Sequence, residues 1–135
     1  MQFDQPLMEA AVRVLVVEDD DLIQHILEDA LTEAGFGIQK AFNARDAITL
    51  LGASDTHFRA LITDIELKSE MTGWDVARHA RTISPDLPVV YASSSGHDWE
   101  SLGVPNSIMV RKPFAPAQVV TAVSQLINAA PKAAT

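Results

Sequence analysis

The sequence predicts an α/β fold in which helices cover both faces of one parallel sheet. Five short runs suited to strands alternate along the chain with segments of helical periodicity. Strands that alternate with helices form parallel βαβ units with right-handed crossovers. The chain has 135 residues and shows neither an internal repeat nor a linker-like stretch, so it fits one domain with its own hydrophobic core.

The expected strands are short. The first, third and fourth are continuous apolar runs, as expected for strands that are buried on both faces of a sheet. The second run is weak and could form an edge of the sheet. The five ranges are residues 13–17, 37–41, 60–63, 89–92 and 107–111.

Helices are expected between these strands. The first carries apolar residues on one helical face and is followed by Gly35, a natural helix end. That apolar face contains Ile23, Ile26, Leu27, Ala30, Leu31 and Ala34. The second helix begins after Asn43, a good N-cap, and the last has Pro116 in its first turn, where proline is tolerated. Besides the helix after residue 43, the predicted ranges are residues 21–34, 73–83, a short stretch at 98–102, and 115–128.

The composition argues against several classes of protein. The net charge is −8, and no Lys/Arg cluster exists beyond the Arg111–Lys112 pair, so nucleic acid is not an expected partner. No stretch approaches the roughly 20 apolar residues of a membrane span. The segment from Met1 to Ala11 has no basic residue and does not resemble a signal peptide. The chain has no cysteine and hence no disulfide framework, and we expect a cytoplasmic protein.

Charged residues directly follow three of the expected strands. Glu18, Asp19 and Asp20 follow the first strand. Asp64 closes the third strand, and Lys112 comes after the fifth. In an open parallel sheet, functional groups gather beyond the carboxyl ends of the strands. Carboxylates and a lysine brought together there suit a divalent cation and a phosphoryl group.

The residue types at these positions indicate a chemistry. Mg²⁺ prefers oxygen ligands, and clustered carboxylates without a cation raise one another's pKa, so Glu18, Asp19 and Asp64 would supply metal ligands. Asp64 ends the central strand alone and is the best placed nucleophile for an aspartyl phosphate. Lys112 would pair with phosphate oxygens, and the hydroxyl of Ser93 would donate to another of them.

Four motifs follow one another along the chain: Val16–Asp20, Ile62–Asp64, Pro88–Ser93 and Lys112–Phe114. Together they resemble the receiver domain of two-component response regulators, and their order and spacing match that family from Val12 to Ile127. The resemblance implies a flavodoxin-like fold, a three-layer sandwich whose parallel five-stranded sheet has the order 2-1-3-4-5. We expect the receiver domain to span residues 12–129, with tails at 1–11 and 130–135.

The resemblance also implies roles for individual residues. Asp64 would be the phosphoacceptor, Ser93 the switch hydroxyl and Lys112 the phosphate-sensing lysine, with a cis bond between Lys112 and Pro113. The phosphoryl donor would be a phosphohistidine on a histidine kinase or a histidine phosphotransfer protein. The domain would catalyse only its own phosphorylation and dephosphorylation and would act by contact with a downstream protein. The implied Mg²⁺ ligands are Glu18, Asp19, Asp64 and the backbone carbonyl of Glu66.

Three features depart from the family pattern. The loop after Asp64 lacks the proline usual in the family and is one residue longer. Met109 stands where the family has its switch aromatic, so we expect the signal to pass through Ser93 and the loop that follows it. The segment from Ser93 to Lys112 is short, and the helix within it should be reduced. This shortened pattern resembles stand-alone receivers more than transcription-factor receivers.

Other interpretations of the same residues stay open. A phosphatase of the haloacid dehalogenase type also uses a nucleophilic aspartate, normally with a second acid two residues later, which is Glu66 here; the lack of a cap domain disfavours it. A degenerate receiver that is never phosphorylated would serve only as an interaction module. The intact acids and Lys112 argue against that function, whereas Met109 and the altered loop leave it open. The acids at 18–20 could also simply cap a helix.

Overall fold

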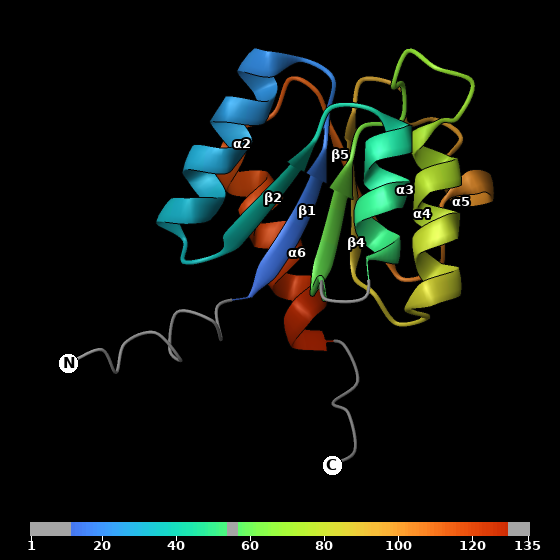
Figure 1. Ribbon diagram of the computed structural model, residues 1–135. Coiled ribbons are helices and arrows are strands. Elements are labelled where there is room, and N and C mark those ends of the chain that lie inside the picture. The colour runs from blue at the N-terminus through green and yellow to red at the C-terminus, as the bar shows by residue number, and fades with distance from the viewer. Residues whose placement is uncertain (1–11, 54–56, 130–135) are drawn as a thin grey trace.

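The computed structural model describes residues 12–53 and 57–129. These residues form a five-stranded sheet in the order β2-β1-β3-β4-β5, and all of its neighbouring strands are parallel (Figure 1). The predicted fold class and strand order are confirmed, and the weak second strand is an edge. The predicted tails at 1–11 and 130–135 lie outside the described residues.

The observed elements agree closely with the predicted ranges. The strands are β1 (Arg13–Val17), β2 (Gly37–Ala41), β3 (Ala60–Thr63), β4 (Val89–Ser93) and β5 (Ser107–Arg111). The helices are α2 (Asp21–Glu33), α3 (Ala44–Gly52), α4 (Gly73–Ile83), α5 (Trp99–Leu102) and α6 (Pro116–Ala129). None of these described helices is long and apolar enough to cross a membrane.

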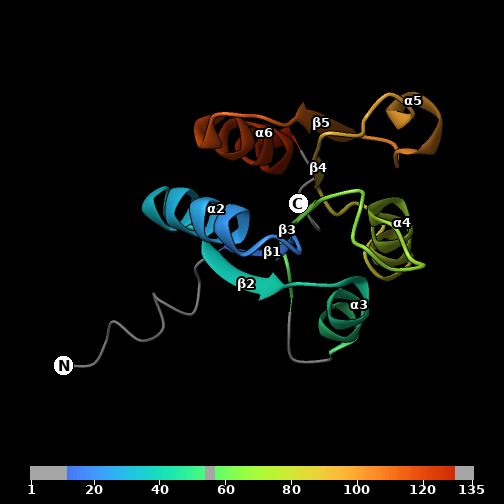
Figure 2. The ribbon, with the colours of Figure 1, turned by 90° about the horizontal axis from the view of Figure 1, so that it is seen from above.

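Helices cover the sheet on both sides. α2 and α6 lie on one face, and α3, α4 and the single turn of α5 lie on the other (Figure 2). Alternate residues of β1 point to opposite faces. Val14 and Val16 join the apolar cluster beneath α2 and α6, whereas Leu15 and Val17 join the cluster beneath α3 and α4. The sheet is therefore the buried middle layer, which explains why its central strands are continuous apolar runs.

A capping box sets the start of α4. The side chain of Thr72 accepts a hydrogen bond from the backbone N–H of Asp75, and the Asp75 carboxylate accepts one from the N–H of Thr72. Gly73, the first helical residue, donates its N–H to the carbonyl of Ile65 at 2.7 Å. A Cβ atom at position 73 would overlap the carbonyl of Asp64. Only glycine allows this close approach, so the start of α4 fixes the backbone at Asp64.

The predicted apolar face of the first helix needs correction. Gln24 is 1% exposed although it is polar, whereas Ile26 is 37% exposed. The buried stripe of α2 consists of Gln24, Leu27 and Leu31, which are three and four residues apart. Ile26 lies beside that stripe and not within it. The helix also ends one residue early, because Ala34 serves as its C-cap.

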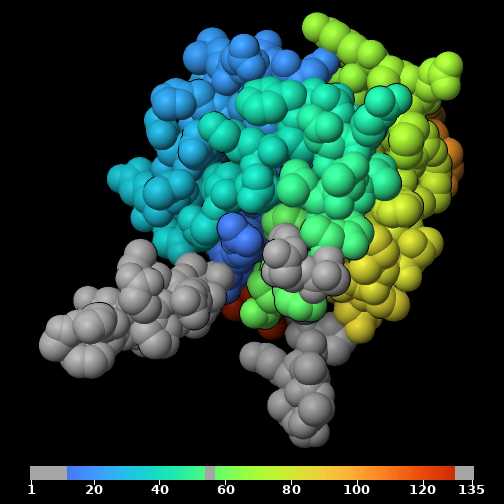
Figure 3. Space-filling view, in the orientation of Figure 1, coloured from blue at the N-terminus to red at the C-terminus, as the bar shows by residue number. Residues whose placement is uncertain are grey.

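The loop between β3 and α4, residues 64–72, projects beyond the carboxyl edge of the sheet (Figures 1 and 3). Ile65 and Leu67 are buried and anchor it. Glu66 and Lys68 alternate with them and are exposed, as are the next two residues. Lys68 has a φ of 54°, in the left-handed region. The loop therefore holds charged side chains beside the strand ends.

Candidate functional site

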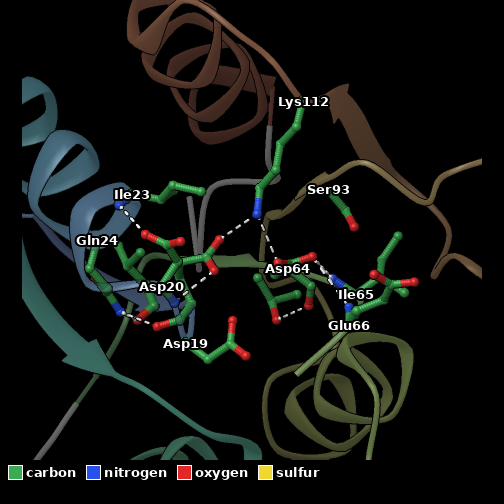
Figure 4. A network of polar contacts seen from close by, with 12 residues as sticks. Asp19, Asp20, Ile23, Gln24, Asp64, Ile65, Glu66, Ser93 and Lys112 are labelled. Atoms are coloured by element: carbon green, nitrogen blue, oxygen red, sulfur yellow. Dashed lines mark hydrogen bonds and ion pairs between the residues drawn. The ribbon is translucent and has the colours of Figure 1, made fainter. Parts of the chain in front are cut away.

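The carboxyl edge of the sheet brings the predicted acids together. Oxygen atoms of Glu18, Asp19 and Asp64 lie within 4.8 Å of one another. Glu18 and Asp19 follow β1, and Asp64 follows the neighbouring strand β3. Lys112 reaches in from the end of β5, and Ser93 lies on the other side of Asp64 from Asp19 (Figure 4). The structure thus assembles all the side chains that the sequence predicted for one site.

Asp64 is held on both of its carboxylate oxygens. Oδ1 accepts hydrogen bonds from the backbone N–H groups of Ile65 at 2.6 Å and Glu66 at 3.2 Å. Oδ2 accepts one from Nζ of Lys112 at 2.9 Å. The residue is only 7% exposed. These contacts orient the carboxylate.

Lys112 bridges two acids from different strands. Its Nζ lies 2.9 Å from Oδ2 of Asp64 and 2.9 Å from Oε1 of Glu18. Burial opposes the charged form of this lysine, but the two carboxylate contacts outweigh it and raise the pKa of Lys112. Its backbone N–H donates to the carbonyl of Ser93 at 3.0 Å, and the following bond to Pro113 is cis, as predicted.

The pKa of Glu18 is strongly raised within this cluster. Burial raises the pKa of Glu18 from 4.5 to about 7; the hydrogen bond from Lys112 lowers it, and the charge of Asp64 adds repulsion. Oε2 also accepts from the N–H of Asp20 at 3.1 Å. Burial and the neighbouring Asp64 thus disfavour the charged form of Glu18 despite its bond from Lys112. A divalent cation would relieve this repulsion.

Asp19 supplies the observation that tests whether a metal fits. Its Oδ2 is buried and has no hydrogen-bond partner. The nearest cation is Nζ of Lys68 at 3.9 Å, beyond hydrogen-bonding distance, on a side chain that is 86% exposed. Buried carboxylate oxygens normally have partners. An unpartnered hard oxygen beside two further carboxylates fits Mg²⁺, which binds through few carboxylates and keeps several waters.

Ser93 is fully buried at the last position of β4. Its Oγ accepts a hydrogen bond from the backbone N–H of Ser95 at 3.2 Å. The strand was predicted to end one residue earlier, at Ala92, and its extra residue pairs with Arg111 of β5. Pairing with β5 therefore places the hydroxyl on a strand rather than on a free loop.

The family model of the response regulator receiver domain matches residues 14–124. The chain belongs to this family.

Relatives and solved structures agree with that assignment. A response regulator receiver protein from Sinorhizobium medicae has a crystal structure that is 41% identical, with a TM-score of 0.86 over 90% of this chain and 98% of that chain. TrrA from Thermotoga maritima, solved in complex with Mg²⁺ and BeF, is 26% identical, with a TM-score of 0.75 over 85% of this chain and 98% of that chain. The probable transcriptional regulatory protein SilR of Salmonella typhimurium is 31% identical over 120 residues, which are 87% of this chain and 51% of SilR. This receiver domain thus spans about half the length of the first curated relatives it matches.

The family assignment decides between the functions left open by the sequence. Receiver domains are phosphoryl-accepting switches of two-component signalling rather than classical enzymes, and the family assignment favours that function for this domain. The haloacid dehalogenase and interaction-only alternatives are not favoured.

The receiver domain also contains a buried residue that sequence reasoning missed. Nε2 of Gln24 lies 2.9 Å from the carbonyls of Val16 and Ala41, and 3.3 Å from the carbonyl of Glu18. Gln24 therefore ties the ends of β1 and β2 together directly beneath the acids and helps to position Glu18. The signal was a polar residue three and seven positions before two core leucines, Leu27 and Leu31.

Met109 occupies the position of the family's switch aromatic in this receiver domain. It is half-buried and packs against the apolar cluster beneath α3 and α4. Its side chain lies against Gly96, where a Cβ atom would collide with the end of the thioether. The β4–α5 loop thus packs directly on β5 through a side chain without a ring or hydroxyl.

Proposed function

We propose that this receiver domain accepts a phosphoryl group on Asp64 from a phosphohistidine. The observation that carries the proposal is the double contact of Lys112 with Asp64 and Glu18, because it aims one cation at the carboxylate oxygen that would react. The phosphorus–nitrogen bond of the donor breaks as a bond forms between phosphorus and Oδ2 of Asp64. The electron pair stays on the imidazole nitrogen, which takes up a proton.

The other side chains of the site would serve that transfer by position and charge. Lys112 would form an ion pair with the phosphoryl oxygens, and the buried Ser93 hydroxyl would donate a hydrogen bond to one of them. Transfer and later hydrolysis would then be catalysed within the domain itself, without a separate enzymatic substrate.

Mg²⁺ fits the remaining donors. Glu18, Asp19 and Asp64, with the backbone carbonyl of Glu66, would hold it, and the unpartnered Oδ2 of Asp19 supports this set. When bound, the cation would neutralise negative charge on the phosphoryl oxygens. The structure of TrrA with Mg²⁺ and BeF provides a precedent in a similar protein.

The donor and target would both be proteins. We infer a histidine kinase or a histidine phosphotransfer protein as donor and a downstream protein as target, within the cytoplasm. The net charge of −8 argues against direct contact with nucleic acid. The receiver domain would span residues 12–129.

Intact mass spectrometry after incubation with acetyl phosphate and Mg²⁺ tests the proposal. One phosphoryl group should be added to the wild type and to Asp86→Asn, in which an exposed acid remote from the site is changed. Asp64→Asn should gain none. Full labelling of Asp64→Asn would refute the assignment, and a folded wild type that gains no phosphoryl group would indicate an interaction-only domain.

A further inference from the structure

Two loops border Asp64, and one hydrogen bond joins their side chains. The hydroxyl of Ser95, in the β4–α5 loop (residues 94–98), donates to Oε2 of Glu66, in the β3–α4 loop, at 2.7 Å. Within the described part of the chain, no other hydrogen bond joins side chains of these two loops. The bond is short and its acceptor is charged, which are properties of the stronger hydrogen bonds in proteins.

Each residue of this bond also contacts a residue of the proposed phosphorylation site. The backbone N–H of Glu66 donates to Oδ1 of Asp64 at 3.2 Å. The backbone N–H of Ser95 donates to Oγ of Ser93 at 3.2 Å. The Glu66–Ser95 bond therefore closes a chain of contacts that runs from the acceptor carboxylate to the switch hydroxyl.

We propose that the Glu66–Ser95 hydrogen bond is a latch that holds the β4–α5 loop in its unphosphorylated position and opens when Asp64 carries a phosphoryl group. Glu66 and Ser95 are then positioning residues for the switch. This inference rests on the proposed function, because it takes Asp64 as the acceptor.

Charge is the first reason that phosphorylation opens the latch. A phosphoryl group carries roughly two negative charges in place of the single charge of the Asp64 carboxylate. It arrives on the carboxylate that already contacts the backbone of Glu66. Repulsion between the phosphoryl group and the Glu66 carboxylate drives that side chain away from its present position and from Ser95.

The second reason is the hydroxyl of Ser93. Its oxygen accepts a hydrogen bond from the N–H of Ser95, and its O–H can donate to a phosphoryl oxygen. In the proposed switch the Ser93 side chain moves toward the phosphoryl group to make that bond, and the movement weakens its bond with Ser95, the second tether of the β4–α5 loop. No residue from Ser94 to Asp98 is buried, so few apolar contacts hold the loop once both polar tethers weaken.

Three substitutions separate the hydrogen bond from the charge. Ser95→Ala removes the bond and keeps the charge of Glu66. Glu66→Gln removes the charge and keeps an oxygen that accepts from Ser95. Ser95→Thr keeps the hydroxyl and should behave as wild type. Ser94→Ala is the matched control, because Ser94 is an exposed neighbour in the same loop.

Amide exchange of the free proteins is the first measurement. A net hydrogen-bond contribution of about 1 kcal/mol corresponds to roughly fivefold faster exchange at residues 95–98 in Ser95→Ala. Ser95→Thr and Ser94→Ala should exchange as slowly as wild type, and Glu66→Gln should lie between wild type and Ser95→Ala, because a neutral acceptor makes a weaker hydrogen bond. If Ser95→Ala also exchanges like wild type, the bond does not hold the loop and the latch is refuted.

Titration with beryllofluoride in the presence of Mg²⁺ is the second measurement. Because the latch and the bound group are linked, Ser95→Ala should bind beryllofluoride tighter by the same factor of roughly five. Exchange at residues 95–98 should rise on binding in the wild type, and rise less in Glu66→Gln. A wild type that takes up neither beryllofluoride nor phosphoryl refutes the proposed function along with the latch. Normal binding by the wild type with an unchanged affinity in Ser95→Ala refutes the latch alone.

Discussion

The acid–lysine cluster and the segment from Ser94 to Asn106 are held in different ways. Glu18 and Asp64 follow the buried strands β1 and β3, Lys112 follows the edge strand β5, and each charge has at least two hydrogen-bond partners. The segment contains only the four-residue helix α5, which buries none of its side chains. Besides the bond between Ser95 and Glu66, its hydrogen bonds to the rest of the domain include one from the indole of Trp99 to Ser107 and one from the N–H of Val104 to the hydroxyl of Tyr91.

The comparison shows that the residues proposed to react and the segment proposed to move on phosphorylation are held by different kinds of contact. Reacting groups need fixed geometry, and the strand ends provide it. A segment that must move needs few tethers, and such segments belong to the low-stability end of a fold. The following predictions test whether the two regions differ in this way.

Removal of Lys112 should have the largest effect on the cluster. In Lys112→Met without Mg²⁺, the free energy of unfolding at neutral pH should fall by about 2–3 kcal/mol, since two charged hydrogen bonds are lost and two carboxylates remain together. Urea unfolding measures this. Lys40→Met, which breaks an exposed pair with Glu28, should cost less than about 1 kcal/mol and serves as the control. Equal losses in both variants would mean that the partly buried cluster contributes no more to stability than an exposed ion pair.

Mg²⁺ should stabilise the cluster end of the domain. A ligand that binds only the folded state adds about 1.4 kcal/mol at a tenfold excess over its dissociation constant. Melting temperatures with and without Mg²⁺ measure the gain, and Asp19→Asn should lose most of it. An unchanged midpoint at millimolar Mg²⁺ would contradict the metal site.

Asp75, in the capping box of α4, should make a pH-dependent contribution to the free energy of unfolding. Its hydrogen bond from the backbone N–H of Thr72 is the largest cause of its lowered pKa, despite some desolvation; the contact with Arg78 lowers it further. The ionised form is favoured by folding, so its contribution is present at neutral pH and is lost as the pH falls through the lowered pKa. Asp75→Ala should cost about 0.5–1 kcal/mol at pH 7 and almost nothing in strong acid. Urea unfolding of both proteins across that range checks the sign, and a difference that grows in acid would contradict it.

The smallest global effect is expected in the loosely held segment. Trp99→Phe keeps an aromatic side chain but removes the hydrogen bond to Ser107. It should change the global free energy of unfolding by less than about 0.5 kcal/mol. Amide exchange should nevertheless rise at residues 99–106 and stay unchanged in β1 and β3. Faster exchange in those central strands would mean that the two regions are not separate.

The fold and the acid–lysine site were predictable from local features of the sequence. The central strands were apolar throughout because both of their faces are buried, and Asn43 caps α3 as predicted, accepting from the N–H of Asp46. The convergence of Glu18, Asp64 and Lys112 followed from parallel strands that end at one edge.

Contacts that depend on packing were not predictable in the same way. A count of apolar residues placed Ile26 inward and overlooked Gln24, because periodicity does not register a polar side chain that finds buried carbonyls. The bond between Glu66 and Ser95 joins two loops that are 29 residues apart and leaves no periodic signal. The site's residue types were therefore predictable, whereas its supporting contacts required the structure.

The aromatic residues in and near α4 determine which part of the domain contributes to its intrinsic fluorescence. The sequence has two tryptophans, and both Trp74 and Trp99 pack with the cluster beneath α3 and α4. The ring of Trp74 lies 4.8 Å from that of Tyr91, close enough for energy transfer from the tyrosine. Intrinsic fluorescence of this protein therefore reports on one side of the sheet only. Trp74→Phe would leave a probe of the loosely held segment, and Trp99→Phe would leave a probe of the helix that backs the acceptor.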